Sequence, residues 1–293
     1  MVIDVSSNPF KDFRVFSDYI QTIKDNNSIN GISQHRLFRS VINTTNWLEI
    51  QSKYYQDSIL NDIDLNETIY SLTQKGISLN LNLPLQVIEE IRNLALATPC
   101  HEPNNTQCSF YASEKKQVMM QTEKPLVRGI YNPSIFLDPT IKKLESDPIL
   151  LAIAATYLNA EPIHQNTQLW WSFAVESTLY ERRQATQRFY RGTNTPRSLT
   201  FYFYLTDVDL CSNPHVCVLE SHRKKKVAYR FLKKDYSLQE ISKYYGYPNI
   251  TSICGKAGFG FVEDARCFHK KISPSSNDRL TLELKFAAMP PLS

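Results

Sequence analysis

Two segments in the second half of the chain alternate strictly between apolar and polar side chains. In residues 198–206 (SLTFYFYLT), leucines and phenylalanines occupy the odd positions, and threonines and tyrosines occupy the even ones. In residues 279–287 (RLTLELKFA), leucines and a phenylalanine alternate with charged and hydroxyl side chains. Successive side chains of a strand point to opposite faces. The pattern therefore predicts two strands of a sheet with one apolar and one polar face.

The first half of the chain shows a different period. The phrases FRVFSDYIQTIKD and NWLEIQSKYYQDSI place apolar residues three and four positions apart, which predicts amphipathic helices within residues 1–64. A lysine-glycine pair ending at Gly76 predicts a turn into a short strand. Pro84 predicts the start of a helix with one apolar face, and Asp147, followed by a proline, predicts the start of another.

Helices followed by strands predict an α+β fold, with a sandwich or barrel of strands that helices buttress on one side. We expect a helical N-terminal extension over residues 1–64 and the strand-rich domain over residues 65–293. The chain has 293 residues, of which 42% are hydrophobic, and this is enough for one large core.

The net charge and the hydropathy of the chain argue against some classes of function and location. A formal net charge of +4 is too weak to predict a nucleic-acid binder without a concentrated basic patch. The first residues, MVIDVSSNPF, lack the basic and apolar regions of a secretory signal, and no uncharged apolar run is long enough to cross a bilayer. The prediction is a cytoplasmic protein without a membrane span.

The cysteines form no CxxC pair, and we expect small buried thiols in a reducing compartment. They are Cys100, Cys108, Cys211, Cys217, Cys254 and Cys267. The segment CHEPNNTQC, residues 100–108, is predicted to be a loop. Its two cysteines and one histidine are a possible metal clip, but no second ligand cluster follows, so a plain loop is favoured.

Four blocks of sequence occur in an order and spacing that resemble one known family. They are LTQKGISLNLNLPLQVIEEI, then SLTFYFYLTDVD with NPHVCVLESHRKKK, then GKAGFGFVEDARCFHK, and finally NDRLTLELKFA. Together they resemble the phytanoyl-CoA dioxygenase family of Fe(II)/2-oxoglutarate oxygenases over about residues 65–293. The resemblance implies a double-stranded β-helix, a jelly-roll or cupin-like barrel whose mouth holds iron.

The resemblance also implies site residues. Such enzymes hold Fe(II) with a His-x-Asp pair and a distant histidine, and an arginine binds the far carboxylate of 2-oxoglutarate. His269 matches the distant histidine, and Arg279, ten residues later, matches the arginine. Tyr190 stands at the position of the first histidine and Gly192 at that of the aspartate. The plainer alternatives are a loop histidine at 269 and an exposed strand charge at 279.

Tyr190 and Gly192 depart from the residues that the resemblance implies, and several alternatives follow for Tyr190 and for other candidate residues. Tyr190 could bind iron as a phenolate if a cation such as Arg188 or Arg191 lowered its pKa, or it could act as an acid or base in a metal-free reaction. Candidate replacement ligands are His215, His222 and Glu220. The basic residues of 222–226, 233–234 and 270–271 could attract an anionic ligand at the barrel mouth, or be solvated loop charges.

The favoured hypothesis is an oxygenase fold without ordinary iron catalysis. The protein would be a binding or regulatory homologue that holds a small carboxylate or metabolite through Arg279, with an active homologue as a possible partner. The alternative is an active oxygenase that oxidises a small metabolite with recruited metal ligands, or a metal-independent enzyme that uses Tyr190. Fe(II) and 2-oxoglutarate are the cofactors that the resemblance implies. Surface-charge binding of nucleic acid or membrane is a distant third option.

Overall fold

The computed structural model describes most of the predicted strand-rich domain. The described residues are 58–60, 62–103, 105–174, 188–191, 197–210, 212, 214–224, 235–270 and 277–288. Most of the predicted helical extension of residues 1–64 lies outside these residues, and so does Gly192. No helix of the described residues is long and apolar enough to span a membrane.

Helices occur mainly before the long central strands. They are α4 (Leu65–Lys75), α5 (Leu85–Ala97), α6 (Lys115–Thr122), α7 (Pro139–Glu145), α8 (Pro148–Leu158) and α10 (Leu238–Tyr245). The strands are β1 (Ile77–Asn82), β2 (Cys100–Glu102), β3 (Asn105–Phe110), β4 (Arg128–Ile130), β5 (Ile163–Ser172), β6 (Arg188–Tyr190), β7 (Ser198–Tyr204), β8 (His215–Val218), β9 (Asp235–Ser237), β10 (Ile250–Ile253), β11 (Phe259–Asp264), β12 (His269–Lys270) and β13 (Arg279–Ala287).

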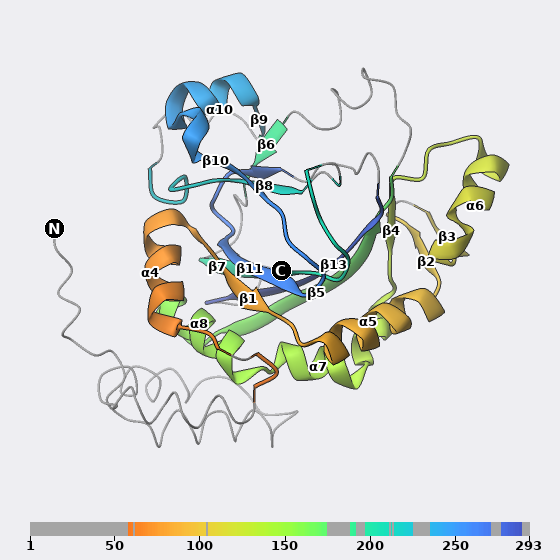
Figure 1. Ribbon diagram of the computed structural model, residues 1–293, viewed down its shortest axis with the longest axis horizontal. Coiled ribbons are helices and arrows are strands. Elements are labelled where there is room, and N and C mark those ends of the chain that lie inside the picture. The colour runs from red at the N-terminus through yellow and green to blue at the C-terminus, as the bar shows by residue number, and fades with distance from the viewer. Residues whose placement is uncertain are drawn as a thin grey trace, which may run out of the picture.

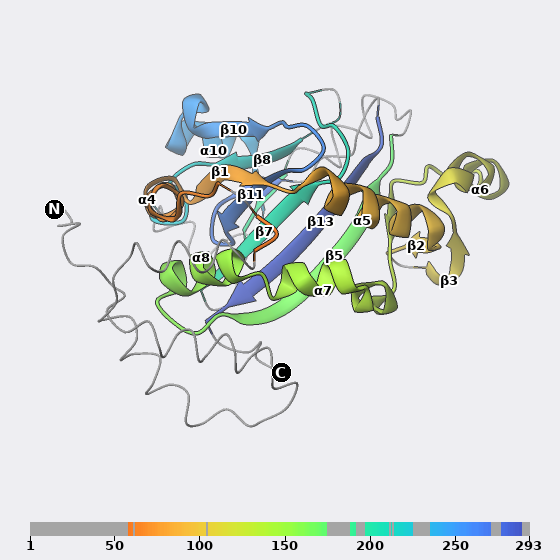
Figure 2. The same cartoon turned by 60° about the horizontal axis from the view of Figure 1, so that its bottom comes forward.

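The strands form two antiparallel sheets. The larger sheet has the order β1-β11-β7-β13-β5-β4-β2-β3, and the smaller has the order β10-β8-β12-β6-β9. Figure 1 shows the smaller sheet on one side of the larger one, with α7 and α8 on the opposite side. Figure 2 shows the long strands β5, β13 and β7 side by side above α7 and α8. The predicted mixture of helices and antiparallel strands is confirmed.

Helix α8 begins at the Asp147–Pro148 pair, as the sequence predicts, and these residues cap its N-terminus. Asp147 accepts hydrogen bonds from the backbone amides of Ile149 and Leu150, and Pro148 occupies the first helical position. The same carboxylate accepts from the backbone amide of Ile59 at 2.8 Å. The buried carboxylate therefore caps the helix and ties the start of the described chain to it.

Gly76 ends α4 and begins the turn into β1, as predicted. Its φ of 83° is in the left-handed region, which a glycine adopts without a steric penalty. A Cβ at this position would lie 2.4 Å from Cys267 Sγ and 2.5 Å from His222 Nδ1. Both conformation and space therefore require glycine here. The helix predicted to start at Pro84 is also confirmed, because α5 begins directly after this proline.

The alternating strands have two buried faces rather than one. The apolar set of β7 and β13, which includes Phe201 and Leu282, packs into the large core on the helix side of the sheet. The other set of β7, which includes Tyr202 and Tyr204, packs with Cys217 of β8 in the smaller sheet. The polar face predicted for these strands is therefore the inner face of the larger sheet, covered by the smaller sheet.

The prediction of a loop at residues 100–108 is wrong. Residues 100–102 and 105–110 form the hairpin β2–β3, and His101 also pairs with Ile130 of β4. Pairing with β4, which is distant in sequence, extends a segment whose composition is typical of a loop.

The expected burial of the cysteines is confirmed in part. Cys100, Cys217 and Cys267 are buried, whereas Cys108 and Cys254 are exposed. Cys211 lies outside the described residues.

Candidate functional site

Polar and ionisable side chains collect between the two sheets. The group comprises Thr200, Tyr202, Tyr204, His215, Glu263, His269, Arg279, Thr281 and Glu283, and each member is buried. Burying polar groups is costly unless they are paired, and such clusters are typical of functional sites. The space between the sheets is therefore the candidate site.

Tyr190 and His269 lie directly opposite each other. His269 of β12 pairs in register with Tyr190 of β6 and, on its other side, with Cys217 of β8. The two rings meet edge to face, with centroids 4.6 Å apart, and His269 Nδ1 lies 3.1 Å from the carbonyl oxygen of Cys267. The structure thus brings together two of the positions that the sequence analysis singled out.

The surroundings of Tyr190 favour its neutral form. Burial raises the pKa of its phenol well above the ordinary value, and the carboxylates of Glu263 and Glu283 raise it further. Although the residue is 37% exposed, its phenol is held among these acids. At neutral pH this phenol is therefore a hydrogen-bond donor rather than an anionic ligand.

The expectation that Arg188 or Arg191 lowers the pKa of Tyr190 is wrong. Arg188 forms an ion pair with Asp235, and the guanidinium of Arg191 lies over the ring of Phe268, 5.5 Å from its centroid. The cation that lowers the phenol pKa is Arg128, from the other sheet. Closeness in sequence is misleading here because consecutive side chains of a strand diverge.

A buried acid next to His269 has no counterpart in the sequence analysis. Oε2 of Glu263, on β11, lies 2.9 Å from Nε2 of His215, and its Oε1 lies 3.8 Å from Nδ1 of His269. The two imidazoles stack, with centroids 5.4 Å apart and planes at 26°. Stacked rings do not direct their nitrogens at one point, so the two imidazoles and Glu263 do not form a facial triad in this arrangement.

The other proposed replacement ligands lie elsewhere. His222 Nε2 is 3.2 Å from the carbonyl oxygen of Thr73, on α4. Glu220 forms ion pairs with Arg223 and Lys224. These three charged residues, with tyrosines of α10, line a pocket of about 540 Å³.

Only part of the expected basic patch falls within the described residues. Lys270 lies over the ring of Phe189, 5.0 Å from its centroid. Residues 225–226, 233–234 and 271 lie outside the described chain.

Arg279 belongs to a row of three residues on one face of the larger sheet. Across the sheet, Ser172 of β5 pairs in register with Arg279 of β13 on one side and with Arg128 of β4 on the other. Direct partners in antiparallel strands share a face, so the three side chains lie side by side. We name Arg128, Ser172 and Arg279 the arginine row.

The arginine row concentrates positive charge away from water. Arg279 is only 4% exposed, which is incompatible with the alternative of an exposed strand charge. Burial lowers its pKa and the neighbouring charge of Arg128 lowers it further, while Tyr204 has the opposite effect. Arg128 is half-buried and stacks over Trp170, 4.7 Å from the ring centroid. The carboxylate of Glu283 partly offsets the charge of Arg128, and two neighbouring cations favour a further anion beside them.

Unsatisfied donors lie in and beside the row. Among the described residues, Arg128 Nε and Thr281 Oγ1 are buried without a hydrogen-bond partner. Thr281 is two residues beyond Arg279 and therefore on the same face of β13. Buried polar groups are normally hydrogen-bonded, so these atoms indicate a place for a bound polar group.

The sequence matches no family model and no curated protein. Its fold does match solved structures. EvdO2 from Micromonospora carbonacea var. aurantiaca, complexed with 2-oxoglutarate, superimposes with a TM-score of 0.53 at 14% identity, covering 80% of this chain and 94% of that one. HygX from Streptomyces hygroscopicus, with nickel and 2-oxoglutarate bound, gives 0.53 at 13%, covering 79% and 91%.

A third similar structure is that of an epimerase. The epimerase SnoN, in complex with Fe³⁺, alpha ketoglutarate and nogalamycin RO, gives a TM-score of 0.51 at 13% identity, covering 76% of this chain and 83% of that one. At these identities the likeness concerns the fold. The chain therefore has the fold found in 2-oxoglutarate-dependent enzymes.

Proposed function

We propose that the protein binds a small carboxylate metabolite between its two sheets and lacks the iron centre of phytanoyl-CoA dioxygenase-like oxygenases. The observation that carries the proposal is the pairing of Tyr190 with His269. Tyr190 is the residue for which the resemblance implies the position of the first histidine ligand, and its raised phenol pKa supports the proposal. The protein is then a binding or regulatory homologue, for which an active relative is the expected partner.

The donor set does not fit an ordinary Fe(II) site. Two imidazoles and a carboxylate hold Fe(II) on one face in such enzymes. Here the corresponding positions carry the imidazole of His269, the phenol of Tyr190 and, at Gly192, no side-chain donor. A phenol whose pKa is raised is a poor ligand, because coordination requires the phenolate.

The arginine row supports the binding half of the proposal. Arg279 and Arg128 offer two guanidinium groups from neighbouring strands, and Thr281 adds a hydroxyl on the same face. Guanidinium groups bind carboxylates through two parallel hydrogen bonds. The 2-oxoglutarate bound in the EvdO2 and HygX structures is a dicarboxylate, and it is the first ligand to test.

Calorimetric titration with 2-oxoglutarate and with succinate tests the binding half. We expect measurable affinity in the native protein and a loss of about 10- to 150-fold in Arg279→Ala, since hydrogen bonds to charged groups contribute about 1.5–3 kcal/mol. Arg188→Ala, which removes an exposed arginine in an ion pair, is the matched control and should bind as the native protein does. Equal affinity in both variants would contradict the proposal.

Anaerobic loading with Fe(II) tests the metal half. We expect the native protein to hold no more iron than His269→Ala does, and to release no succinate from 2-oxoglutarate. Stoichiometric iron, with succinate release that His269→Ala abolishes, would overturn this half of the proposal.

One observation favours the second candidate, an enzyme with recruited ligands or without a metal. Glu263 places a buried carboxylate next to His215 and His269, and the neutral Tyr190 could donate a proton to a substrate. In this case Glu263→Gln should abolish turnover of a small metabolite while 2-oxoglutarate binding at the arginine row is kept. Loss of turnover in Tyr190→Phe alone would instead favour the metal-free reaction.

A further inference from the structure

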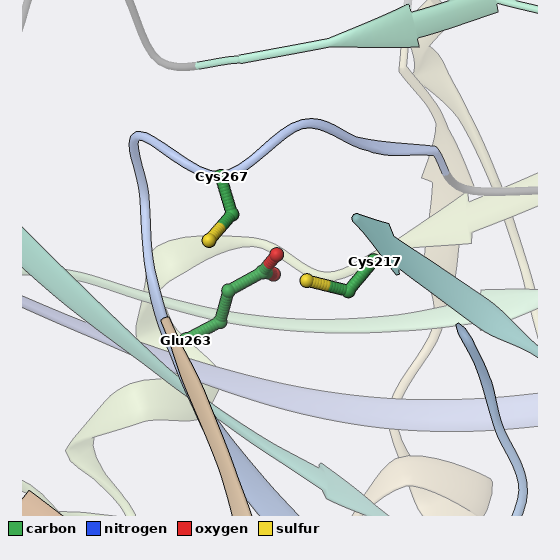
Figure 3. Close-up of side chains that lie close together, drawn as sticks. All are labelled: Cys217, Glu263 and Cys267. Atoms are coloured by element: carbon green, nitrogen blue, oxygen red, sulfur yellow. The ribbon is translucent and has the colours of Figure 1, made fainter. Parts of the chain in front are cut away.

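Two cysteines and an acid, none of which belongs to the arginine row, meet in the interior. Sγ of Cys217, Sγ of Cys267 and a carboxylate oxygen of Glu263 all lie within 4.8 Å of one another. Figure 3 shows the carboxylate of Glu263 between the sulfur atoms of Cys217 and Cys267. None of the three side chains is more than 1% exposed. We name these residues the thiol cluster.

The spacing of the thiol cluster is close to that of a metal site. Zinc binds cysteine sulfur at about 2.3 Å and carboxylate oxygen at about 2.0–2.2 Å in tetrahedral geometry. Those lengths put neighbouring donor atoms about 3.5–3.8 Å apart. The donors would have to approach one another by about 1 Å at most, which a change of side-chain torsion provides.

A rigid turn holds two of the donors. Glu263 is followed by Asp264, whose carbonyl oxygen accepts a hydrogen bond from the amide of Cys267 at 2.8 Å. The carboxylate of Asp264 forms an ion pair with Arg266 and accepts a hydrogen bond from Tyr157, on α8, at 2.6 Å. The turn therefore fixes the separation of Glu263 and Cys267 before any ligand is bound.

The third donor comes from the opposite sheet. Cys217 lies on β8, in the smaller sheet, whereas Glu263 lies on β11, in the larger one. His215, two residues before Cys217 on the same strand, has Nε2 2.9 Å from Glu263 Oε2. Carboxylates that bind protein metals are themselves hydrogen-bonded, and such partners orient the ligand.

We propose that Cys217, Glu263 and Cys267 bind a thiophilic divalent cation, with zinc as the first candidate. Two soft sulfur ligands select for such a metal over magnesium or calcium. Each thiol releases its proton when it coordinates, and His215 orients Glu263. The cation joins the two sheets and stabilises the fold. This site is independent of the carboxylate binding proposed above, because it uses no residue of the arginine row.

The test is titration of the metal-free, reduced protein with Co²⁺, which replaces zinc and reports thiolate ligands by a charge-transfer absorption in the near ultraviolet. We expect this band to saturate at one Co²⁺ per chain. It should disappear in Cys217→Ser and in Cys267→Ser, with a loss of affinity of more than about 100-fold, since even residues that only orient ligands contribute 10–100-fold. Cys100→Ser, at a buried cysteine in the β2–β3 hairpin, is the matched control and should keep the band.

A second variant covers the case in which the serine variants fail to fold. Glu263→Gln keeps both thiols and nearly the same shape, and it should keep a thiolate band at weaker cobalt affinity. The native protein should also melt at a higher temperature with zinc than after chelation, because the ligand binds the folded state. Arg279→Ala should bind cobalt as the native protein does, which separates this test from that of the carboxylate site.

Three outcomes would overturn the proposal. The first is cobalt uptake by the native protein without a thiolate band, or no uptake. The second is a band of unchanged intensity in both folded cysteine variants. The third is a disulfide between Cys217 and Cys267, found by peptide mapping of protein isolated without exposure to air, because a disulfide leaves neither sulfur free to bind a metal.

Discussion

The Tyr190–His269 pair and the arginine row lie on opposite sheets and differ in the kind of ligand they suit. The pair offers an imidazole and a neutral phenol, which is a weak set for a hard cation. The row offers two guanidinium groups and a buried hydroxyl nearby, which is a strong set for an anion. The residues of the proposed metal positions and of the proposed carboxylate site thus lie on different strands, and we expect one function to change without the other.

We expect the largest effect from restoring the histidine and the aspartate that the resemblance implies at positions 190 and 192. In the double variant Tyr190→His with Gly192→Asp, we expect the iron bound after anaerobic Fe(II) loading to exceed that of the native protein by about one per chain, since a complete facial triad is then present. Metal analysis after gel filtration measures it. A variant that folds normally and stays free of iron would show that the ligand positions are misassigned.

Replacing Arg279 by lysine should have a smaller effect, which we expect on the affinity for 2-oxoglutarate. Arg279→Lys keeps the charge but loses the planar fork that binds a carboxylate with two hydrogen bonds. We expect 2-oxoglutarate affinity to fall about tenfold, corresponding to the loss of one charge-assisted hydrogen bond. Calorimetry on Arg279→Lys and Arg279→Ala should rank lysine between arginine and alanine, and any other ranking would argue against a direct contact.

Arg128 should contribute less than Arg279, because it is only half-buried and already stacks on Trp170. We expect Arg128→Gln to weaken carboxylate binding by roughly three- to tenfold, which is less than a full charge-assisted hydrogen bond contributes. Dependence of the affinity on salt should also decrease, since one cation is removed from the site. An unchanged affinity would restrict the anion site to Arg279 and its neighbours on β13.

The smallest effect concerns the pH dependence of stability. The pKa of Tyr190 is raised in the folded protein above the ordinary value near 10, so the unfolded chain loses this proton first as the pH rises. The stability that Tyr190 contributes is thus complete below about pH 10 and is lost above it.

Chemical unfolding between about pH 8 and 11 should therefore show a shallower decline for Tyr190→Phe than for the native protein. The difference will be modest, because other buried tyrosines, such as Tyr202 and Tyr204, have raised pKa values too. Identical slopes would indicate that the phenol is solvated, and the argument against a phenolate ligand would lose its basis.

Local signals in the sequence predict much of the fold. The turn at Gly76, the helix start at Pro84 and the cap at Asp147 depend on neighbouring residues, and the structure has each of them. The hairpin over residues 100–110 depends on pairing with β4, and its composition is typical of a loop. Pairing between distant segments is not encoded locally, which explains the error.

Fewer residues of the candidate site could be predicted from the sequence, because contacts between distant segments form it. Glu263 is the second-last residue of the largely apolar strand β11, where a charge is typical of the surface, and the covering smaller sheet buries it. Arg128 lies on a three-residue strand whose alternation is too short to detect. The positions of Tyr190, His269 and Arg279 came from the resemblance, and their roles stay predictions until they are tested.

Thr281 and the two arginines have a practical consequence for anyone who purifies this protein. A site that offers two guanidinium groups and a hydroxyl will also accept chloride, sulfate or phosphate from a buffer. Weak apparent affinity for an organic acid would then reflect competition, and it would vary with the identity of the buffer anion at constant ionic strength. Binding assays in acetate-free, low-chloride solution with a bulky organic counter-ion should therefore give the tightest constants.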